Sequence, residues 1–315
     1  MKYALTGATG FVGSHLLQRL RADGHDVVAV VRKPMDLDAD VRIGDVTSHS
    51  SLLEAFDGVD GVFHVAGWYK VGDDHPEQGW AVNVQGTRNA LAAARECGVP
   101  RVVYTSTVAV NSDTKGKVVD ETYQFTGEHI SVYDHTKAQA HQIAHEFAAE
   151  GLDVVTVMPS GIYGPGDTSQ AGELIRQTAL GRRVQAPAGL RICMAHVDDI
   201  ADGHVRAMER GRTGEDYMLA GPQTTLVEVL RLVAELSGGK PPLVMPDAAV
   251  GATAALMSVV ERGVRVPSIY RSESLRVCRA SYLGRSDKAA AELGWFPRDL
   301  HTGLAETVEW DQAQG

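Results

Sequence analysis

The chain has 315 residues, of which 44% are apolar and 22% are charged, the proportions of an ordinary globular protein. Because this length exceeds what one hydrophobic core usually holds, we expect one large domain and a smaller lobe. The formal net charge of −10 argues against nucleic acids and anionic membranes as partners.

The chain begins with a short apolar strand, Tyr3-Ala4-Leu5, which leads through a glycine-rich turn into an amphipathic helix. In such a turn Gly7 permits the tight bend, Gly10 lets the backbone approach a pyrophosphate, and Gly13 lets the helix pack on the strand. Free N–H groups at the positive end of the helix then bind the anion. The motif predicts a dinucleotide cofactor. Its predicted contacts are Gly7, Thr9, Gly10, Phe11, Val12 and Gly13.

Strands and helices alternate along the rest of the first half. Apolar, β-branched runs predict strands at residues 27–31, 59–65, 102–105 and 154–157. Helical patterns fall at residues 18–22, 51–56, 79–96 and 131–150. This alternation predicts βαβ units, and therefore a parallel sheet with helices on both faces. We expect a doubly wound α/β fold, a Rossmann domain, over residues 1–160.

The alternating pattern loosens after Pro159. Glycines and a proline mark a loop at residues 161–166, and helical patterns return at 171–180, 199–209, 225–236 and 247–261. We expect residues 161–315 to form mainly a smaller substrate-binding lobe. The strand-like segment Asp216–Leu219 is predicted to return to the main sheet.

A second motif, Tyr133-Asp134-His135-Thr136-Lys137, lies on the predicted helix 131–150. Residues four positions apart share a helix face, so the phenol of Tyr133 and the ammonium of Lys137 point the same way. An unperturbed tyrosine has a pKa of about 10. A nearby lysine charge lowers that pKa towards the operating pH. The spacing therefore predicts an acid–base pair.

Cysteines and apolar segments indicate no further site. The three cysteines, Cys97, Cys193 and Cys278, are widely separated, so neither a disulfide framework nor a zinc ribbon is indicated. The longest apolar stretch, residues 248–260, is too short to span a bilayer. The N-terminus has no signal-peptide core, which favours a cytoplasmic enzyme.

The histidines are predicted to bind no metal. His141 and His145 have i, i+4 spacing, but no glutamate follows His141 and no third ligand is evident. We therefore expect both to be surface residues. His196 precedes Asp198 and Asp199, which are expected to cap the next helix in a structural role.

Together the motifs resemble the extended short-chain dehydrogenase/reductase family, in its NAD-dependent epimerase/dehydratase branch. The resemblance covers nearly the whole chain. Besides the glycine turn and the Tyr133/Lys137 pair, it rests on matches at residues 44–46, 62–66, 83–87, 105–107, 159–167, 196–199 and 293–295. Within the branch, residues 30–32, 63–66 and 104–107 are most similar to dihydroflavonol-reductase-like proteins, including bacterial hopanoid-associated sugar epimerases.

The resemblance implies roles for individual residues. Tyr133 would donate the proton, and Lys137 would hold the nicotinamide ribose. Thr107 would be the third catalytic hydroxyl, with Ser106 as the alternative. Further cofactor contacts would come from Asp45, Val46, His64, Ala66, Asn83, Thr105, Ser106, Pro159 and Ile162. A homodimer is also expected.

The cofactor is predicted to be NADP(H), with NAD(H) as the alternative. An acidic residue at the end of the second strand would bind the adenosine ribose hydroxyls and favour NAD. This chain instead has Arg32 and Lys33 there, which suit a 2′-phosphate. Asp36, Asp38 and Asp40 follow closely, and one of them could fold back onto the ribose.

The substrate is expected to be a small molecule near Trp68, Tyr69 and Tyr163. Apolar ketones would need aromatic and aliphatic walls, whereas a nucleotide sugar would need basic groups such as those at 182, 183 and 191. We expect net reduction of a ketone or aldehyde. The alternative is a nucleotide-sugar epimerase or dehydratase with tightly bound NAD. A non-catalytic, cofactor-sensing regulator would need no catalytic pair.

Overall fold

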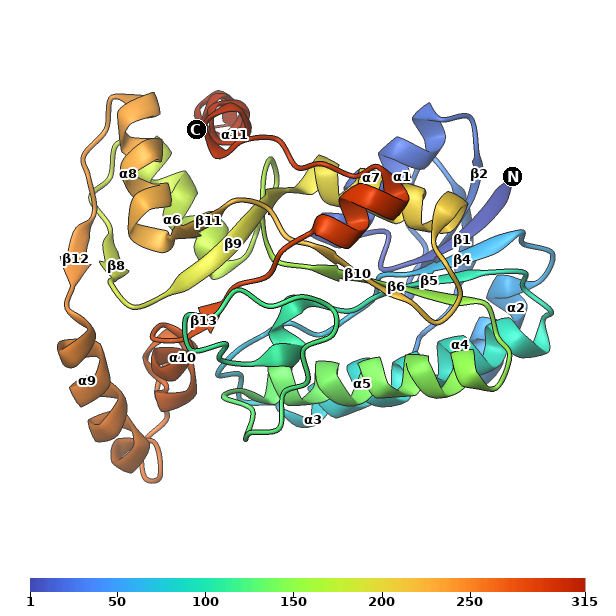
Figure 1. Cartoon of the computed structure of the whole chain (residues 1–315), viewed down its shortest axis with the longest axis horizontal. Helices are drawn as coiled ribbons and strands as arrows, with labels where there is room; N and C mark the ends of the chain where they lie inside the picture. Colours follow the sequence, from blue (N-terminus) through green and yellow to red (C-terminus); the bar gives the residue numbers. More distant parts are fainter. Residues whose placement is uncertain (315) are drawn as a thin grey trace.

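The structure is a computed structural model and describes residues 1–314. Seven parallel strands form its central sheet, in the order β10-β6-β5-β4-β1-β2-β3 (Figure 1). Their bounds are β1 Lys2–Thr6, β2 Asp26–Val31, β3 Asp40–Ile43, β4 Gly61–His64, β5 Val102–Thr105, β6 Val154–Pro159 and β10 Asp216–Leu219. Every residue of β4 and β6 is buried, as in a parallel sheet covered on both faces.

The strand order reverses at β1. From this strand the chain builds β2 and β3 on one side, then crosses to build β4, β5 and β6 on the other. At such a point the loops that follow neighbouring strands diverge and leave a crevice at the carboxyl edge of the sheet. The segments that follow β1 and β4 therefore border the position where ligands bind in open α/β sheets.

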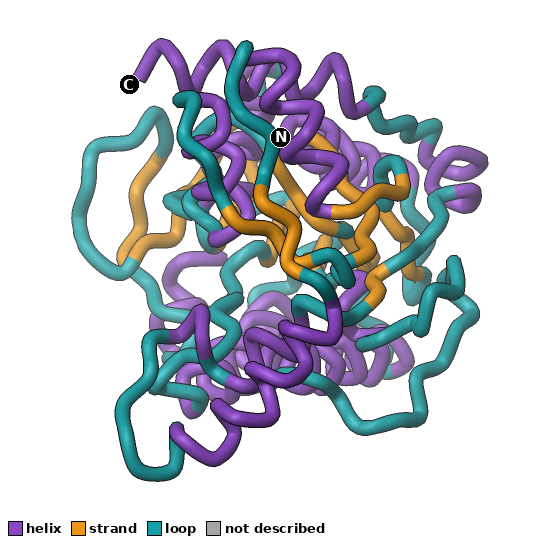
Figure 2. The backbone as a smooth tube through the Cα atoms, turned by 90° about the vertical axis from the view of Figure 1, so that its left-hand side faces the viewer, coloured by secondary structure: helices purple, strands orange, loops and turns teal. Residues whose placement is uncertain are grey.

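Helices cover both faces of this sheet, as Figure 2 shows. One face carries α1 (Phe11–Ala22) and α7 (Val197–Arg210), whose apolar residues share one core. The opposite face carries α2 (His49–Phe56), α4 (Gly86–Glu96) and α5 (Val132–Ala149). A one-turn helix, α3 (Glu77–Gly79), and a π-helix, η1 (Trp80–Gln85), lead directly into α4.

The second lobe combines short strands with a separate helical core. Its strands are β7 Gly161–Tyr163, β8 Gln185–Pro187, β9 Arg191–His196, β11 Gln223–Thr225, β12 Leu243–Met245 and β13 Ser281–Tyr282. Its helices are α6 Gln170–Ala179, α8 Leu226–Ser237, α9 Asp247–Val260, α10 Ser272–Val277 and α11 Leu300–Gln314. Short 3-10 and π segments are η2 Val108–Asn111, η3 Ser268–Tyr270 and η4 Ala289–Leu293. Within residues 1–314, no helix has both the length and the apolar character needed to cross a membrane.

Two segments beyond residue 160 complete the first unit. β10 pairs in parallel with β6, which confirms the predicted return of Asp216–Leu219 to the main sheet. α7 packs on α1 and begins at Val197, earlier than expected. Its cap is His196, whose Nδ1 accepts the Asp198 N–H at 3.3 Å, so the expected caps at Asp198 and Asp199 were wrong. The proposed boundary at residue 160 stays a prediction.

Candidate active site

The glycine turn lies between β1 and α1. Gly7 has a φ of +76°, and a Cβ there would approach the Ala66 backbone nitrogen to 2.8 Å. A Cβ at Gly13 would overlap the Gly7 carbonyl oxygen. The atoms that such side chains would meet belong to the backbone of Ala66 and Gly7, which cannot shift without distorting the fold. Any side chain at these two positions would therefore push the turn away from the sheet edge.

The first turn of α1 keeps its N–H groups available. Gly10 precedes the helix and offers no capping side chain, and the first turn holds no acidic residue. Thr9 and Gly10 are exposed, whereas Phe11 and Val12 are half-buried. A helix start with free donors and little side-chain cover fits the pyrophosphate of a dinucleotide.

The segment after β2 presents two cations. Arg32 and Lys33 are exposed and form no ion pair with any other residue of the described chain, 1–314. Nearby, Asp38 lies 3.5 Å from Arg21, and Asp40 lies 3.7 Å from Lys2. Two of the three nearby aspartates therefore already have cationic partners.

Asp45 and Val46 follow β3 and support the loop there. The Asp45 carboxylate accepts the Thr47 N–H at 2.9 Å, and its own N–H donates to Ser51 Oγ at 3.0 Å. The Val46 carbonyl accepts an amide proton from Asn89 at 2.8 Å. These contacts fix the backbone of the predicted adenine-binding segment.

Tyr133 and Thr107 come together at the carboxyl end of β5. Tyr133 lies in the first turn of α5, and its phenol is near enough to the Thr107 side chain for Thr107 to influence its pKa. Ser106 points elsewhere, because its Oγ lies 2.8 Å from His141 Nδ1. This placement favours Thr107 over Ser106 as the hydroxyl that accompanies the phenol.

Burial raises the pKa of Tyr133 to about 12, although the polar side chain of Thr107 opposes that rise. The charge of Asp134 raises the pKa further. The expected lowering by Lys137 is therefore wrong for the protein alone. At neutral pH the phenol keeps its proton, which is the form that a proton donor needs.

Lys137 is buried and is hydrogen-bonded to β5 rather than to the phenol. Its Nζ donates to the Thr105 carbonyl at 2.7 Å and to the Tyr104 hydroxyl at 3.1 Å. It also lies over the Tyr104 ring, 4.8 Å from the centroid. Burial lowers the pKa of Lys137 to about 7. The Thr105 hydroxyl is 2.8 Å from His204 Nε2, so this residue offers the site its carbonyl and not its side chain.

His64 lies under the crevice as a buried, neutral ring. Its Nδ1 is 2.9 Å from Thr6 Oγ1, and its Nε2 is 3.3 Å from Thr87 Oγ1. Burial, together with the charge of Lys137, lowers the pKa of His64 to about 3. Thr6 also accepts the Ala66 N–H at 3.2 Å. Both ring nitrogens are thus engaged, and the ring links β1, β4 and α4; the cofactor contact of His64 stays a prediction, which only its backbone is free to make.

Asn83 connects the loop after β4 to the helix of the phenol. Its Oδ1 accepts the Trp68 N–H at 2.7 Å, and its Nδ2 donates to the Trp68 carbonyl at 2.9 Å. The same Nδ2 donates to Thr136 Oγ1 at 2.9 Å. Asn83 therefore links the Trp68 loop to α5, and its predicted role in supporting the site stays a prediction. It lies in the π-helical segment η1, a geometry often found at functional sites.

The predicted substrate residues differ in exposure. Tyr69 is 57% exposed and can border a pocket, whereas Trp68 is 7% exposed. Tyr163 is 1% exposed and packs edge-on against His196 in the core of the second lobe. Tyr163 thus has no surface to offer a substrate, which corrects its assignment.

Pro159 ends β6 and Ile162 lies in β7, between the main sheet and the second lobe. Pro159 is buried and Ile162 half-buried. Pro159 is the last residue of the strand next to β5 and Ile162 follows soon after it, so both lie near the carboxyl edge of the sheet, which also carries Thr107. Their predicted position beside the nicotinamide is compatible with this placement.

Two contacts from the second lobe reach the start of α5 and were not predicted. Glu273, in α10, accepts the Val132 N–H at 2.7 Å. Tyr282, in β13, donates to the buried carboxylate of Asp134 at 3.0 Å. Residues this far apart in the chain leave no periodic signal in the sequence. They place α10 and β13 against the first turn of α5, beside the phenol.

A family model for the NAD-dependent epimerase/dehydratase family matches residues 3–220, more than half of the chain. The chain belongs to this family. The match covers the glycine turn, the Tyr133/Lys137 pair and the return strand β10. This epimerase/dehydratase-family protein is an enzyme with an NAD(P)-binding Rossmann fold, since its relatives are reductases, dehydrogenases and epimerases.

Three curated relatives match this family member over almost its entire length. A "Putative dihydroflavonol 4-reductase" from Synechocystis is 32% identical, over 99% of this chain and 95% of its own. A "Sterol demethylase protein B" from Methylococcus capsulatus is 31% identical, over 100% and 99%. A "4-hydroxy-2-methyl-3-oxo-4-farnesyl-3,4-dihydroquinoline-1-oxide ketoreductase" from Stigmatella aurantiaca is 33% identical, over 96% of this chain and 93% of its own.

Solved structures agree with this fold. The crystal structure of gox2253 superposes with a TM-score of 0.86 and is 32% identical, covering 99% of this chain and 98% of its own. A nucleoside-diphosphate-sugar epimerase from Pseudomonas aeruginosa has a TM-score of 0.80 and 26% identity, covering 100% and 98%. Family members therefore include both reductases and epimerases.

Proposed function

We propose that this enzyme reduces a ketone or aldehyde at the expense of NADPH, with Tyr133 as the proton donor. The observation that carries the proposal is the phenol of Tyr133 beside Thr107, since burial raises its pKa to about 12 and keeps it protonated. A protonated phenol is ready to protonate an oxygen that gains negative charge. The catalytic centre comprises Tyr133, Thr107 and Lys137.

In this proposal Thr107 and Tyr133 hold the substrate oxygen between their hydroxyls. The cofactor supplies a hydride to the carbonyl carbon when it is bound. As negative charge develops on the oxygen, hydrogen bonds from these two residues stabilise it, and the Tyr133 proton moves to it. Lys137 holds the nicotinamide ribose and stays linked to the Thr105 carbonyl. Asn83 holds the loop at Trp68 against α5 through its hydrogen bonds to both.

Cofactor contacts are proposed along the crevice between β1 and β4. The glycine turn, with Gly7, Gly10 and Gly13, would bind the pyrophosphate. The loop at Asp45 and Val46 would bind the adenine. Unpaired cations at Arg32 and Lys33 support NADP(H) over NAD(H), because a 2′-phosphate would give them their missing partner. The ion pairs of Asp38 and Asp40 support the same choice.

Replacing Arg32 with alanine should weaken NADPH binding at least about tenfold and leave NADH binding nearly unchanged. A charge-assisted hydrogen bond contributes about 1.5–3 kcal/mol, and 1.4 kcal/mol corresponds to a factor of ten. Fluorescence titration of both cofactors into both proteins measures the effect. Arg262→Ala, at another exposed arginine, is the matched control. Equal affinities of the unmodified enzyme for NADPH and NADH would contradict the prediction.

The proposed substrate is a carbonyl compound with a large apolar body. The relatives named for dihydroflavonol, sterol and farnesylated substrates support this class. The exposed Tyr69, which follows β4, supplies an aromatic edge for such a molecule. A homodimer in the cytoplasm remains part of the proposal.

The alternative function is a nucleotide-sugar epimerase or dehydratase. The similarity to a nucleoside-diphosphate-sugar epimerase favours it, and Arg182, Arg183 and Arg191 are exposed and could bind a second pyrophosphate. Such an enzyme must retain its cofactor while the oxidised sugar turns over, whereas a reductase must release it in each cycle.

Cofactor content and consumption distinguish the two functions. We expect the purified enzyme to carry little nucleotide and to consume NADPH stoichiometrically with a carbonyl substrate. Protein denatured after purification releases any bound nucleotide for assay, and a panel of apolar ketones and aldehydes tests consumption. Near-stoichiometric bound NAD, with turnover of a nucleotide sugar and none of the panel, would establish the epimerase instead.

A further inference from the structure

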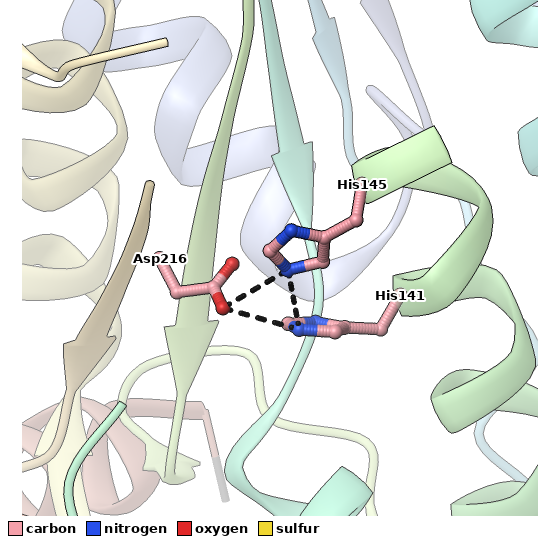
Figure 3. A group of neighbouring side chains, drawn as sticks. All are labelled: His141, His145 and Asp216. Carbon is pink, nitrogen blue, oxygen red and sulfur yellow. Dashed lines mark hydrogen bonds and ion pairs between the residues drawn. The ribbon is translucent and has the colours of Figure 1, made fainter. Parts of the chain in front are cut away.

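The row of residues that starts at the catalytic phenol continues along α5. Tyr133, Lys137, His141 and His145 follow one another at intervals of four, so they lie along one side of the helix. The two histidines lie beside β10, the edge strand of the main sheet, as Figure 3 shows. Asp216, the first residue of that strand, points towards them (Figure 3). The sequence offered no third ligand for this pair, but the fold provides one.

Three ligand atoms converge at this place. Asp216 Oδ2 lies 3.2 Å from His141 Nε2 and 3.1 Å from His145 Nε2, and the two nitrogens are 3.0 Å apart. Around a tetrahedral ion with ligands at about 2.0 Å, neighbouring ligand atoms are about 3.3 Å apart. The three atoms thus form nearly one face of such a tetrahedron before any ion binds.

The orientation of His141 is fixed from behind. Its Nδ1 lies 2.8 Å from Ser106 Oγ, a contact that holds the ring with Nε2 towards Asp216. Metal-bound histidines commonly have such a partner on the second ring nitrogen. The His145 Nε2 atom faces the same carboxylate oxygen, so both rings present a nitrogen to one point.

Exposure and charge allow an ion to enter. The side chains of His141 and Asp216 are 17% and 12% exposed, and that of His145 is 37% exposed. The second oxygen of Asp216, Oδ1, is buried without a hydrogen-bond partner among residues 1–314. Glu215 and Lys288 also lie near the histidines, but they form an ion pair with each other at 2.6 Å. Their opposite charges therefore largely cancel at the site. Solvent thus reaches the site from the His145 side.

We propose that His141, His145 and Asp216 bind a divalent ion of the zinc class, with water in the fourth position. Two imidazoles and one carboxylate are ligands that Zn²⁺ accepts, whereas Mg²⁺ and Ca²⁺ prefer oxygen alone. The ion joins the C-terminal half of α5 to the edge strand β10. Bound there, the ion would fasten the helix that carries Tyr133 and Lys137 to the sheet.

Direct metal binding tests the proposal without any assay of activity. Tag-free protein, stripped with chelator, is dialysed against Zn²⁺ and its metal content measured. We expect one zinc ion per chain in the unmodified protein and in His301→Ala, a control at an exposed histidine. His145→Ala and Asp216→Asn should bind none above background. Co²⁺ should give the intense visible spectrum of tetrahedral coordination in the first two proteins only.

Thermal unfolding provides a second measurement on the same proteins. Zinc at about 100 times its dissociation constant should raise the Tm of the unmodified protein by about 4 °C, and Mg²⁺ should not. Circular dichroism in chelator shows whether each variant is folded, and His145→Gln replaces any variant that is not. Zinc binding equal in the unmodified protein and the His145 variants, or no zinc bound by the unmodified protein, would overturn the site.

Discussion

Replacing Tyr133 with phenylalanine should lower turnover about 10²–10⁴-fold and leave NADPH affinity nearly unchanged. The substitution removes the proton that the developing alkoxide receives but keeps the ring that packs near Thr107. Because the interaction is made in the transition state, kcat and kcat/KM should fall together. Steady-state kinetics on a carbonyl substrate and a cofactor titration measure the two effects separately.

Two further variants make this result interpretable. Tyr270→Phe removes a phenol that is 52% exposed and should leave turnover unchanged. Thr107→Val removes a hydroxyl that orients the substrate oxygen, so it should cost less than Tyr133→Phe. If Tyr133→Phe turned over the substrate at nearly the unmodified rate, another group would have to be the proton donor.

Replacing Lys137 with methionine should abolish most activity and yet stabilise the protein at neutral and acidic pH. Burial lowers the pKa of Lys137 to about 7 from its usual value of 10.5, so the folded state disfavours the charged amine. Such a shift corresponds to a few kcal/mol, on the order of 1.4 kcal/mol for each unit. Methionine fills similar space without that charge.

The sign of the pH dependence follows from the two pKa values. Below about pH 7 the amine is charged in both states, and the folded protein bears the full cost of burial. As pH rises from about 7 towards 10.5, the folded state loses its proton first and the cost disappears. The stability advantage of Lys137→Met should therefore be largest at acidic pH and shrink at alkaline pH.

Urea unfolding of both proteins at about pH 6.5 and about pH 9.5 measures the difference in their free energy of unfolding near each end of this range. Titrating groups away from Lys137 cancel, because they are common to the unmodified protein and the variant, and His64 stays neutral at both pH values because burial is the main cause of its low pKa. Lys240→Met, at an exposed lysine, controls for the loss of a positive charge. If the difference in unfolding free energy between the two proteins stayed constant with pH, the pKa of Lys137 would not be lowered in the folded state.

Local patterns in the sequence predicted the sheet and the cofactor turn. Strands β1, β2, β4, β5 and β6 coincide with apolar, β-branched runs, because strands buried on both faces of a parallel sheet need such residues. The glycine turn was recognisable because only glycine fits where Gly7 meets the end of β4. The short strands of the second lobe escaped prediction, since β7 and β13, of three and two residues, are too short for any periodicity.

Helical spacing likewise predicted which residues share a side of α5. It placed Tyr133 with Lys137, and the same rule paired His141 with His145. Helical spacing could not show which residues of the neighbouring strands contact these side chains. The amine of Lys137 is held by Thr105 and Tyr104 of β5, so its effect on the phenol is smaller than that of burial.

The sequence by itself determined the fold class, the dinucleotide turn and the family, because each depends on residues that are neighbours along the chain. Only the tertiary structure decided that Ser106 contacts His141, that Tyr163 is core, and that Asp216 joins the two histidines. The physical reason is the same in all three cases. A side chain's partners depend on which strands and helices pack together, and Asp216 stands 71 residues from His145 until β10 returns to the sheet.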